Sequence, residues 1–168
     1  MYCCNYQSPI GDLVIAGTED YICGLWLVGQ KHFPTSLPTL VSQCEIPKSL
    51  QLASRWLDAY FAGCKPTIDA MPLVPHGSTF QKIVWKHLCC IPYGHTATYG
   101  QLAEAVASEL GMTKMSAQAI GGAVGRNPIS ILIPCHRVVG SHGQLTGYAG
   151  GLTNKRWLLQ HEGLTFRE

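Results

Sequence analysis

The chain has 168 residues and a mass of 18.3 kDa, which is enough for one domain or for two small ones. It is 46% hydrophobic and only 13% charged, so it can bury a core, and this composition excludes an intrinsically disordered chain. The net charge of +2 is uneven: residues 1–79 hold four basic against six acidic side chains, and residues 80–168 hold eight against four. This asymmetry is a weak indication that the second half meets a polyanion, and chance scatter of surface charge explains it equally well.

No apolar run approaches the roughly 18 residues of a membrane span, and the first residues lack the features of a signal peptide. We therefore expect a cytoplasmic protein with no membrane partner, in which the eight cysteines are mostly free thiols. The chain has no C-x-x-C motif, and the spacing of its cysteines and histidines matches no zinc site, so we expect no metal and no cofactor. Six cysteines are interpreted as structural: Cys3, Cys4, Cys44, Cys64, Cys89 and Cys90.

The first half of the chain predicts a small antiparallel sheet followed by a helix. Three β-rich runs, separated by turn-like or polar breaks, predict strands over residues 2–7, 13–16 and 22–28. Residues 29–48 have no regular period and predict a loop, whereas helical spacing of apolar residues predicts a helix over residues 50–61. Two prolines and a glycine over residues 70–77 mark a linker, so we expect one domain over residues 1–76 and a second over residues 77–168.

The second half predicts four helices and one strand. Ser78 and Thr98 each begin a capping box, and Ser116 is a third N-cap, so helices are expected from these residues to about residues 89, 110 and 125. The last two form a candidate helix-turn-helix with a long joint. The apolar run over residues 129–139 predicts a strand, and Thr153 is expected to cap a last helix over residues 154–161. The expected fold class is α+β, with a mainly helical C-terminal domain.

The strongest chemical signal is the tetrapeptide Pro134-Cys135-His136-Arg137, which follows a buried apolar run. An ordinary thiol is mostly protonated at neutral pH, and a neighbouring base or positive charge raises its thiolate fraction. His136 is the candidate base, although neighbours in a regular strand face opposite sides, so its contact with the sulfur needs a bridging water or a local bend. A lone buried cysteine is usually inert, but the whole tetrapeptide favours a nucleophile.

The run Ile133-Pro134-Cys135-His136-Arg137-Val138-Val139-Gly140 resembles the active-site motif of the O6-alkylguanine-DNA alkyltransferases, the methylated-DNA–protein-cysteine methyltransferases. The similarity extends over residues 78–163, through segments such as Tyr99-Gly100-Gln101-Leu102-Ala103 and His161-Glu162-Gly163. Over residues 1–70 it is loose. The resemblance implies a ribonuclease-H-like N-terminal domain and a DNA-repair activity that transfers one alkyl group per molecule.

The resemblance also implies a role for each catalytic candidate. Cys135 would take the alkyl group from the O6 atom of guanine, and His136 would draw the thiol proton through a water molecule. Glu162 would orient His136, and Asn127 would hold the turn before the active-site segment. Tyr99 would donate a hydrogen bond to the base or turn the target phosphate, which helps the nucleotide to leave the base stack.

The implied partner is double-stranded DNA that bears O6-alkylguanine, with O4-alkylthymine as a second substrate, bound by a monomer. The helix over residues 117–125 would enter the minor groove, where small residues allow close backbone approach. The implied DNA contacts are Ala117, Gln118, Gly121, Gly122, Arg126 and Arg137. The implied pocket for the alkylated base is formed by Val138, Tyr148, Ala149 and Gly150.

One position departs from the family pattern. Most members carry an arginine on this helix that enters the base stack where the flipped nucleotide was, and Gln118 stands at the matching place. Arg126 is eight residues further on, about 80° away in helical phase, and cannot substitute for it.

Two other functions fit the same residues. A cysteine hydrolase using Cys135 and His136 would turn over repeatedly, and it would need an oxyanion hole that the sequence does not reveal. A DNA-binding sensor without chemistry would share the scaffold but would not need Cys135. The number of alkyl groups taken up per molecule separates the three.

Overall fold

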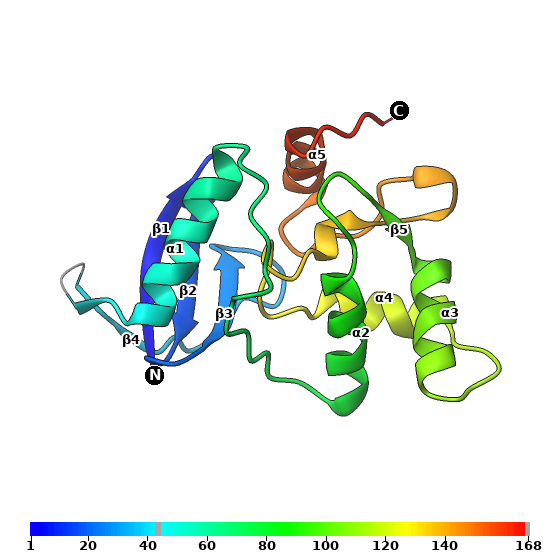
Figure 1. Ribbon diagram of the computed structural model, residues 1–168, viewed down its shortest axis with the longest axis horizontal. Coiled ribbons are helices and arrows are strands. Elements are labelled where there is room, and N and C mark those ends of the chain that lie inside the picture. The colour runs from blue at the N-terminus through cyan, green and yellow to red at the C-terminus, as the bar shows by residue number, and fades with distance from the viewer. Residues whose placement is uncertain (43–44, 167–168) are drawn as a thin grey trace. The chain divides into compact units, whose positions relative to one another are not determined.

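The computed structural model describes residues 1–42 and 45–166, which form two compact units (Figure 1). The first unit contains Met1–His76 together with Pro128–Leu132, and the second contains Gly77–Asn127 and the chain from Ile133 onward. The segment Pro128–Leu132, which we expected in the C-terminal domain, thus belongs with the N-terminal residues.

The first unit is a four-stranded sheet with one long helix. Its strands are β1 (Tyr2–Ser8), β2 (Gly11–Gly17), β3 (Ile22–Leu27) and β4 (Thr39–Leu40), in the spatial order β3-β2-β1-β4. The expected antiparallel meander of β1, β2 and β3 is confirmed, and the short strand β4, which lacks a sequence signal, adds parallel to β1.

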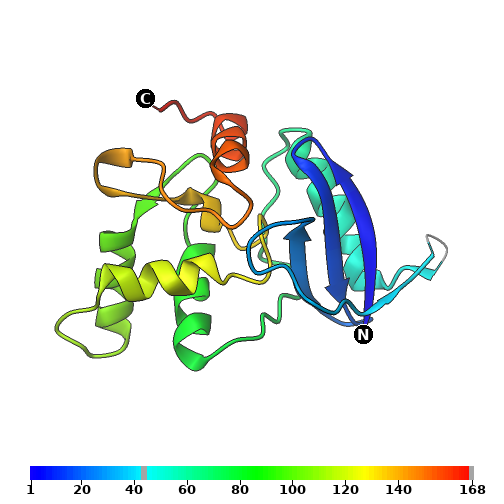
Figure 2. The same cartoon turned by 180° about the vertical axis from the view of Figure 1, so that it is seen from behind.

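The helix α1 (Lys48–Phe61) covers one face of this sheet, as Figures 1 and 2 show from opposite sides. It buries Leu50, Ala53 and Leu57, which recur every three or four residues. On strands β1 and β2, Cys3, Val14 and Ala16 form a further apolar cluster, against which Trp26 and Phe33 pack. Apolar residues on both faces explain why β2 is a continuous buried run rather than an alternating one.

The expected strand over residues 129–139 is wrong. The Leu25 backbone donates a hydrogen bond to Pro128 O (2.9 Å) and accepts one from Ser130 N (2.8 Å), so this short segment pairs with the edge of β3. The chain then turns at Ile131, whose φ of 70° is incompatible with a strand, and Pro134 offers no N–H donor for a ladder. Only the short strand β6 (Val138–Val139) remains, paired in parallel with β5 (Ala97–Thr98).

The second unit is mainly helical, as expected. Its helices are α2 (Thr79–Cys89), α3 (Tyr99–Glu109), α4 (Ala117–Gly125) and α5 (Leu152–His161), with 3₁₀ turns η2 (Cys135–Arg137) and η3 (Ser141–Gly143). Both hydrogen bonds of each expected capping box are present, at the starts of α2 and α3. Helix α5 begins at Leu152 with Gly151 as N-cap, two residues before the expected start, so Thr153 is not its cap.

Helix α4 packs against both α2 and α3, and a loop over residues 110–116 joins α3 to α4 (Figure 2). The buried Trp85 indole on α2 donates a hydrogen bond to Ala123 O on α4 (2.9 Å), which joins these two helices. The α+β class, with a small sheet unit and a helical unit, is confirmed. Among the described residues, no helix is long and apolar enough to cross a membrane.

Candidate active site

A tight local bend presents Cys135. The chain passes into the first unit after Asn127 and returns at Ile133, and the Asn127 side chain closes this excursion by donating from Nδ2 to Ile133 O (2.8 Å). Cys135 N then donates to Ile133 O (2.8 Å) and Arg137 N to Pro134 O (3.0 Å), which forms the turn η2. Because η2 is a turn rather than a strand, the local bend that His136 requires is present.

The Cys135 thiol is buried, at 5% exposure. Burial raises its pKa, because desolvation disfavours the thiolate. A hydrogen bond from the Asn127 side chain, the positive charge of Lys155 and the backbone N–H groups of Cys135 and His136 oppose this shift. The resting sulfur is therefore a protonated thiol that needs a proton acceptor, but several groups are already placed to stabilise its anion.

The other described cysteines are also free thiols, and Cys44 lies outside the described residues. Cys3 and Cys4 are buried, and burial raises the pKa of Cys4 to about 11, which favours the unreactive thiol form. Cys64 and Cys90 are exposed rather than structural.

His136 and Glu162 form a fully buried pair with 2.6 Å between Nε2 and Oε1. Its hydrogen-bond partners lower the pKa of Glu162 to about 2, against the effect of burial, so the carboxylate is ionised and can only accept. The shared proton is therefore on His136 Nε2. Burial lowers the pKa of His136 despite the carboxylate, which keeps the ring neutral at pH 7 with its lone pair on Nδ1.

Lys155 is the functional candidate that the sequence analysis missed. Its side chain is fully buried on α5, and its ammonium donates to the carbonyls of Val138, Thr146 (2.8 Å) and Gly147 (3.2 Å). Burial lowers the pKa of this lysine to about 8, and the nearby Cys135 opposes that shift. A usable signal existed: Lys155 shares one helix face with the buried Leu158 and Leu159, where a lysine is unexpected.

Two of the expected site residues, Tyr99 and Tyr148, lie near enough to Cys135 to interact with it electrostatically. The Tyr99 hydroxyl, at the start of α3, donates to Thr146 O (3.4 Å). Burial raises the pKa of both Tyr99 and Tyr148, and the charge of a Cys135 thiolate would add to this shift. The Tyr148 hydroxyl is buried and has no hydrogen-bond partner among the described residues, so it is a donor available to a ligand. Ala149 and Gly150 continue this loop and are half-buried.

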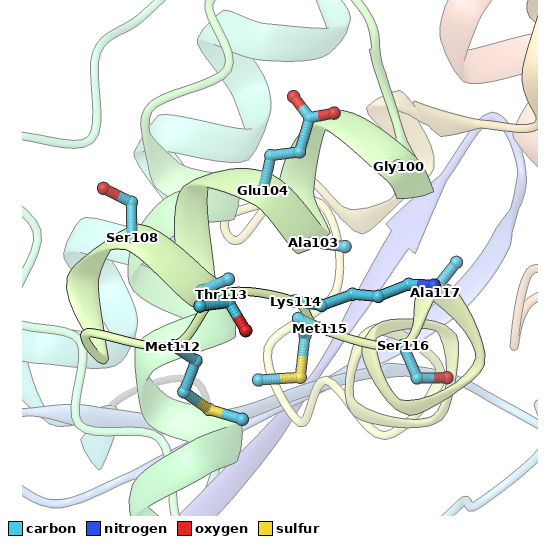
Figure 3. A pocket seen from close by; sticks show the side chains of 11 residues that line it. Gly100, Ala103, Glu104, Ser108, Met112, Thr113, Lys114, Met115, Ser116 and Ala117 are labelled. Carbon is cyan, nitrogen blue, oxygen red and sulfur yellow. The ribbon is translucent and has the colours of Figure 1, made fainter.

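The expected DNA contacts on α4 lie at an accessible surface. Ala117, Gln118, Gly122 and Arg126 are exposed and Gly121 is half-exposed. A hollow of about 710 Å³ lies beside the start of this helix, between α3 and the loop that carries Met112, Lys114 and Met115 (Figure 3). The α4 residues in this set are small, polar or positively charged, as suits a surface that approaches a nucleic-acid backbone, whereas the hollow also contains the acidic Glu104.

Arg137 is the exception, because its side chain is buried and paired rather than at the surface, which does not support the expected DNA contact. Its side chain is only 9% exposed and forms an ion pair with Glu162, with 2.9 Å between Nε and Oε2. A guanidinium in a buried ion pair cannot contact a phosphate at the surface without leaving Glu162 uncompensated.

Both halves of the chain are similar to known proteins. Residues 1–75 match the family model of the 6-O-methylguanine DNA methyltransferase ribonuclease-like domain, and residues 79–164 match that of the DNA-binding domain of the same family. Methylated-DNA–protein-cysteine methyltransferases of Methanosarcina acetivorans and Mycobacterium leprae are 44% and 41% identical to the chain. The alignments cover 97% and 96% of the chain, and 99% and 92% of the relatives.

The fold agrees with solved structures as well. A crystal structure of Mycobacterium tuberculosis OGT in complex with DNA superposes with a TM-score of 0.81 at 39% sequence identity, over 96% of this chain and 92% of the other. Both domain models, near-complete coverage by relatives and this structural match agree with one another. The chain belongs to the 6-O-methylguanine DNA methyltransferase family.

Proposed function

We propose that the protein repairs DNA by transferring the alkyl group of O6-alkylguanine to Cys135. The observation that carries this assignment to Cys135 is the environment of its thiol. The thiol is buried, and an amide, an ammonium and two backbone N–H groups favour its anion beside a neutral histidine that is oriented by an ionised carboxylate. This is the arrangement that a soft sulfur nucleophile needs for a displacement at carbon.

The transfer is one displacement in which all atoms balance. The Cys135 thiol gives its proton to His136, directly or through water, and the sulfur attacks the alkyl carbon. An S–C bond forms, the C–O6 bond breaks, and its electron pair stays with the base, which takes up one proton and leaves as guanine. The product at Cys135 is a thioether, which no group near it can hydrolyse, so each molecule acts once and needs no cofactor.

The remaining residues of the site recognise the base. Tyr99 and Tyr148 supply hydroxyl groups near Cys135, and Val138 O accepts a hydrogen bond from Lys155. Lys155 also ties Val138 to the loop at Thr146 and Gly147, so it shapes the pocket while its charge favours the thiolate. Asn127 holds the turn that presents the sulfur.

The buried sulfur cannot reach an O6 atom that is stacked inside a duplex, so the nucleotide must flip out. We assign the surface of α4 that carries Ala117, Gln118, Gly121, Gly122 and Arg126 to the minor groove. The same chemistry applies to O4-alkylthymine, whose alkyl group is also on an exocyclic oxygen. We propose that the protein acts as a monomer in the cytoplasm.

The test is an intact-mass titration of the full chain with an oligonucleotide that contains O6-methylguanine. We expect one methyl group per protein molecule, after which uptake stops. Repeated turnover of the substrate would instead support the cysteine hydrolase, and binding without uptake would support a sensor. Either result would overturn the proposed transfer.

We also expect salt-dependent binding to undamaged duplex DNA, because phosphate contacts release counterions. Two of the eight positive side chains of the second half, Arg137 and Lys155, are buried and paired, which leaves six, and Lys86 among these pairs with Glu109. If Lys114 and Arg126 contribute the contacts, the slope of log K against log salt is about −2.

The matched variants sharpen this measurement. The Arg126→Gln substitution should reduce the magnitude of the slope by about one. The Lys82→Gln substitution removes the same charge from an exposed position on α2 and should leave the slope unchanged. Binding that does not weaken between low and high salt would show that the proposed phosphate contacts are wrong.

A further inference from the structure

Arg137 meets Glu162 as a two-pronged contact inside the second unit. Its Nε donates to Oε2 (2.9 Å) and its Nη2 donates to Oε1 (3.1 Å), so both carboxylate oxygens are held. The third nitrogen, Nη1, donates to the backbone carbonyl of Ile91 (2.6 Å), and the guanidinium carbon lies 5.8 Å from the centre of the Tyr93 ring. The orientation of the guanidinium is therefore fixed on three sides, and it cannot swing outward without losing all of these contacts.

The same carboxylate has two further donors. Oε1 also accepts from His136 Nε2 (2.6 Å), and Oε2 also accepts from Gly94 N (3.1 Å). A carboxylate offers about four acceptor positions, so Arg137, His136 and Gly94 together fill them. Glu162 thus has no freedom to rotate, and the imidazole that it holds is fixed in one orientation.

We propose that Arg137 is a positioning residue for the alkyl transfer, which pairs with Glu162 so that this carboxylate orients His136 without charging its ring. The proposal rests on the proposed function, because it gives His136 the role of proton acceptor. Without the guanidinium, the buried carboxylate would face the imidazole alone and would favour an imidazolium, which cannot take a proton from Cys135.

The charges around the ring support this division of roles. Glu162 at the end of α5 favours the protonated ring, whereas Arg137 in η2 and Lys155 on α5 disfavour it, in addition to burial. The titratable groups that face Arg137 from neighbouring elements are Cys89 on α2 and Tyr93 in the loop after it. Neither carries a charge at neutral pH, because burial raises the pKa of each, so Glu162 is the anion that compensates Arg137.

Two variants separate the charge of Arg137 from its geometry. Alkyl transfer is measured from free O6-methylguanine, which removes DNA binding from the assay, and the rate is followed against pH by intact mass. In Arg137→Gln the ring should bind a proton up to a higher pH. The rate should therefore fall on the acidic side, by about tenfold for each unit by which the raised histidine pKa exceeds the pH of the assay, and it should recover as the pH is raised. In Arg137→Lys the charge remains, so the acidic limb should stay in place while the maximum rate falls, because the two-pronged contact is lost.

The control is Lys82→Gln, which removes one exposed positive charge and should keep both the wild-type rate and the wild-type pH profile. An Arg137→Gln profile that coincides with this control, or that is lowered equally at every pH, would overturn the proposal. A wild-type chain that takes up no methyl group would instead overturn the proposed function, so the two failures are distinguishable.

A measurement on the wild-type chain covers the case in which Arg137→Gln does not fold. Nuclear magnetic resonance of ring-labelled histidine should show His136 neutral at pH 7, with its proton on Nε2. Arg137→Lys should show the same tautomer. A protonated His136 ring in the resting wild-type protein at neutral pH would overturn the proposal.

Discussion

Replacing Cys135 by serine is expected to abolish alkyl transfer and to leave the fold intact. A hydroxyl is far less acidic than a thiol, and its oxygen is a harder and weaker nucleophile toward an alkyl carbon. A neutral His136, which suffices for a thiol, is too weak a base to ionise serine without a stronger electrophile. The side chain is nearly isosteric and buried at 5% exposure, so we expect only a small change in the free energy of unfolding. The measurement is intact mass after incubation with an O6-methylguanine oligonucleotide.

The other cysteines provide the controls for this prediction. Of the eight in the chain, Cys64 and Cys90 are exposed free thiols, so they would react first if uptake depended on accessibility alone. Peptide mapping of the methylated wild-type protein should find the adduct on Cys135 only, and Cys90→Ser should take up a full equivalent. Measurable methyl uptake by Cys135→Ser would refute the assignment of the nucleophile.

Much of the second unit could be predicted because its signals are local. The capping boxes at Ser78 and Thr98 join residues three apart, and each begins a helix at the expected place. The N-cap at Ser116 likewise bonds the backbone N–H groups of Gln118 and Ala119. These contacts depend on neighbours in the sequence, so no knowledge of the tertiary fold is needed to find them.

The segment before Cys135 could not be predicted in this way. Its apolar residues are typical of a buried strand, but residues 128–130 pair with Leu25 on β3, more than a hundred positions earlier in the chain. The sequence also does not indicate that Ile131 adopts a positive φ, which is unusual for a β-branched residue. Such long-range backbone pairing overrides local preference and produces a turn where a strand was expected.

The residues of the candidate site also differ in whether local sequence signals reveal them. The motif around Cys135 predicted a candidate nucleophile, a candidate base and a candidate pocket loop, because these residues are close in sequence. Lys155 and Arg137 were missed or misassigned, because a buried cation is recognised only by its partners. Those partners are backbone carbonyls for Lys155 and Glu162 for Arg137, and both sets lie elsewhere in the chain.

The second large effect is expected at Gln118, where an arginine should speed the repair of duplex DNA. Gln118 is exposed near the start of α4, so a longer side chain can be accommodated there. A guanidinium can stack between bases and hydrogen-bond the orphaned partner base, whereas glutamine has one carbonyl, one amide and no charge. Flipping costs a few kcal/mol in a paired duplex, and the rate should rise about tenfold for each 1.4 kcal/mol by which Gln118→Arg stabilises the flipped state.

The ratio of two rates isolates this effect, because free O6-methylguanine needs no flipping. Gln118→Arg should raise the rate with duplex DNA and scarcely alter the rate with the free base, while Gln118→Lys, which adds the charge without the planar group, should raise the duplex rate less. Equal changes in both rates would mean that residue 118 acts on the chemical step or on folding. If neither rate changes, stacking by residue 118 is not what limits flipping. In that case another residue enters the base stack, and the candidates are Lys114 and Met115 in the loop before α4, which line the neighbouring hollow (Figure 3). The other explanation is that α4 lies differently on DNA.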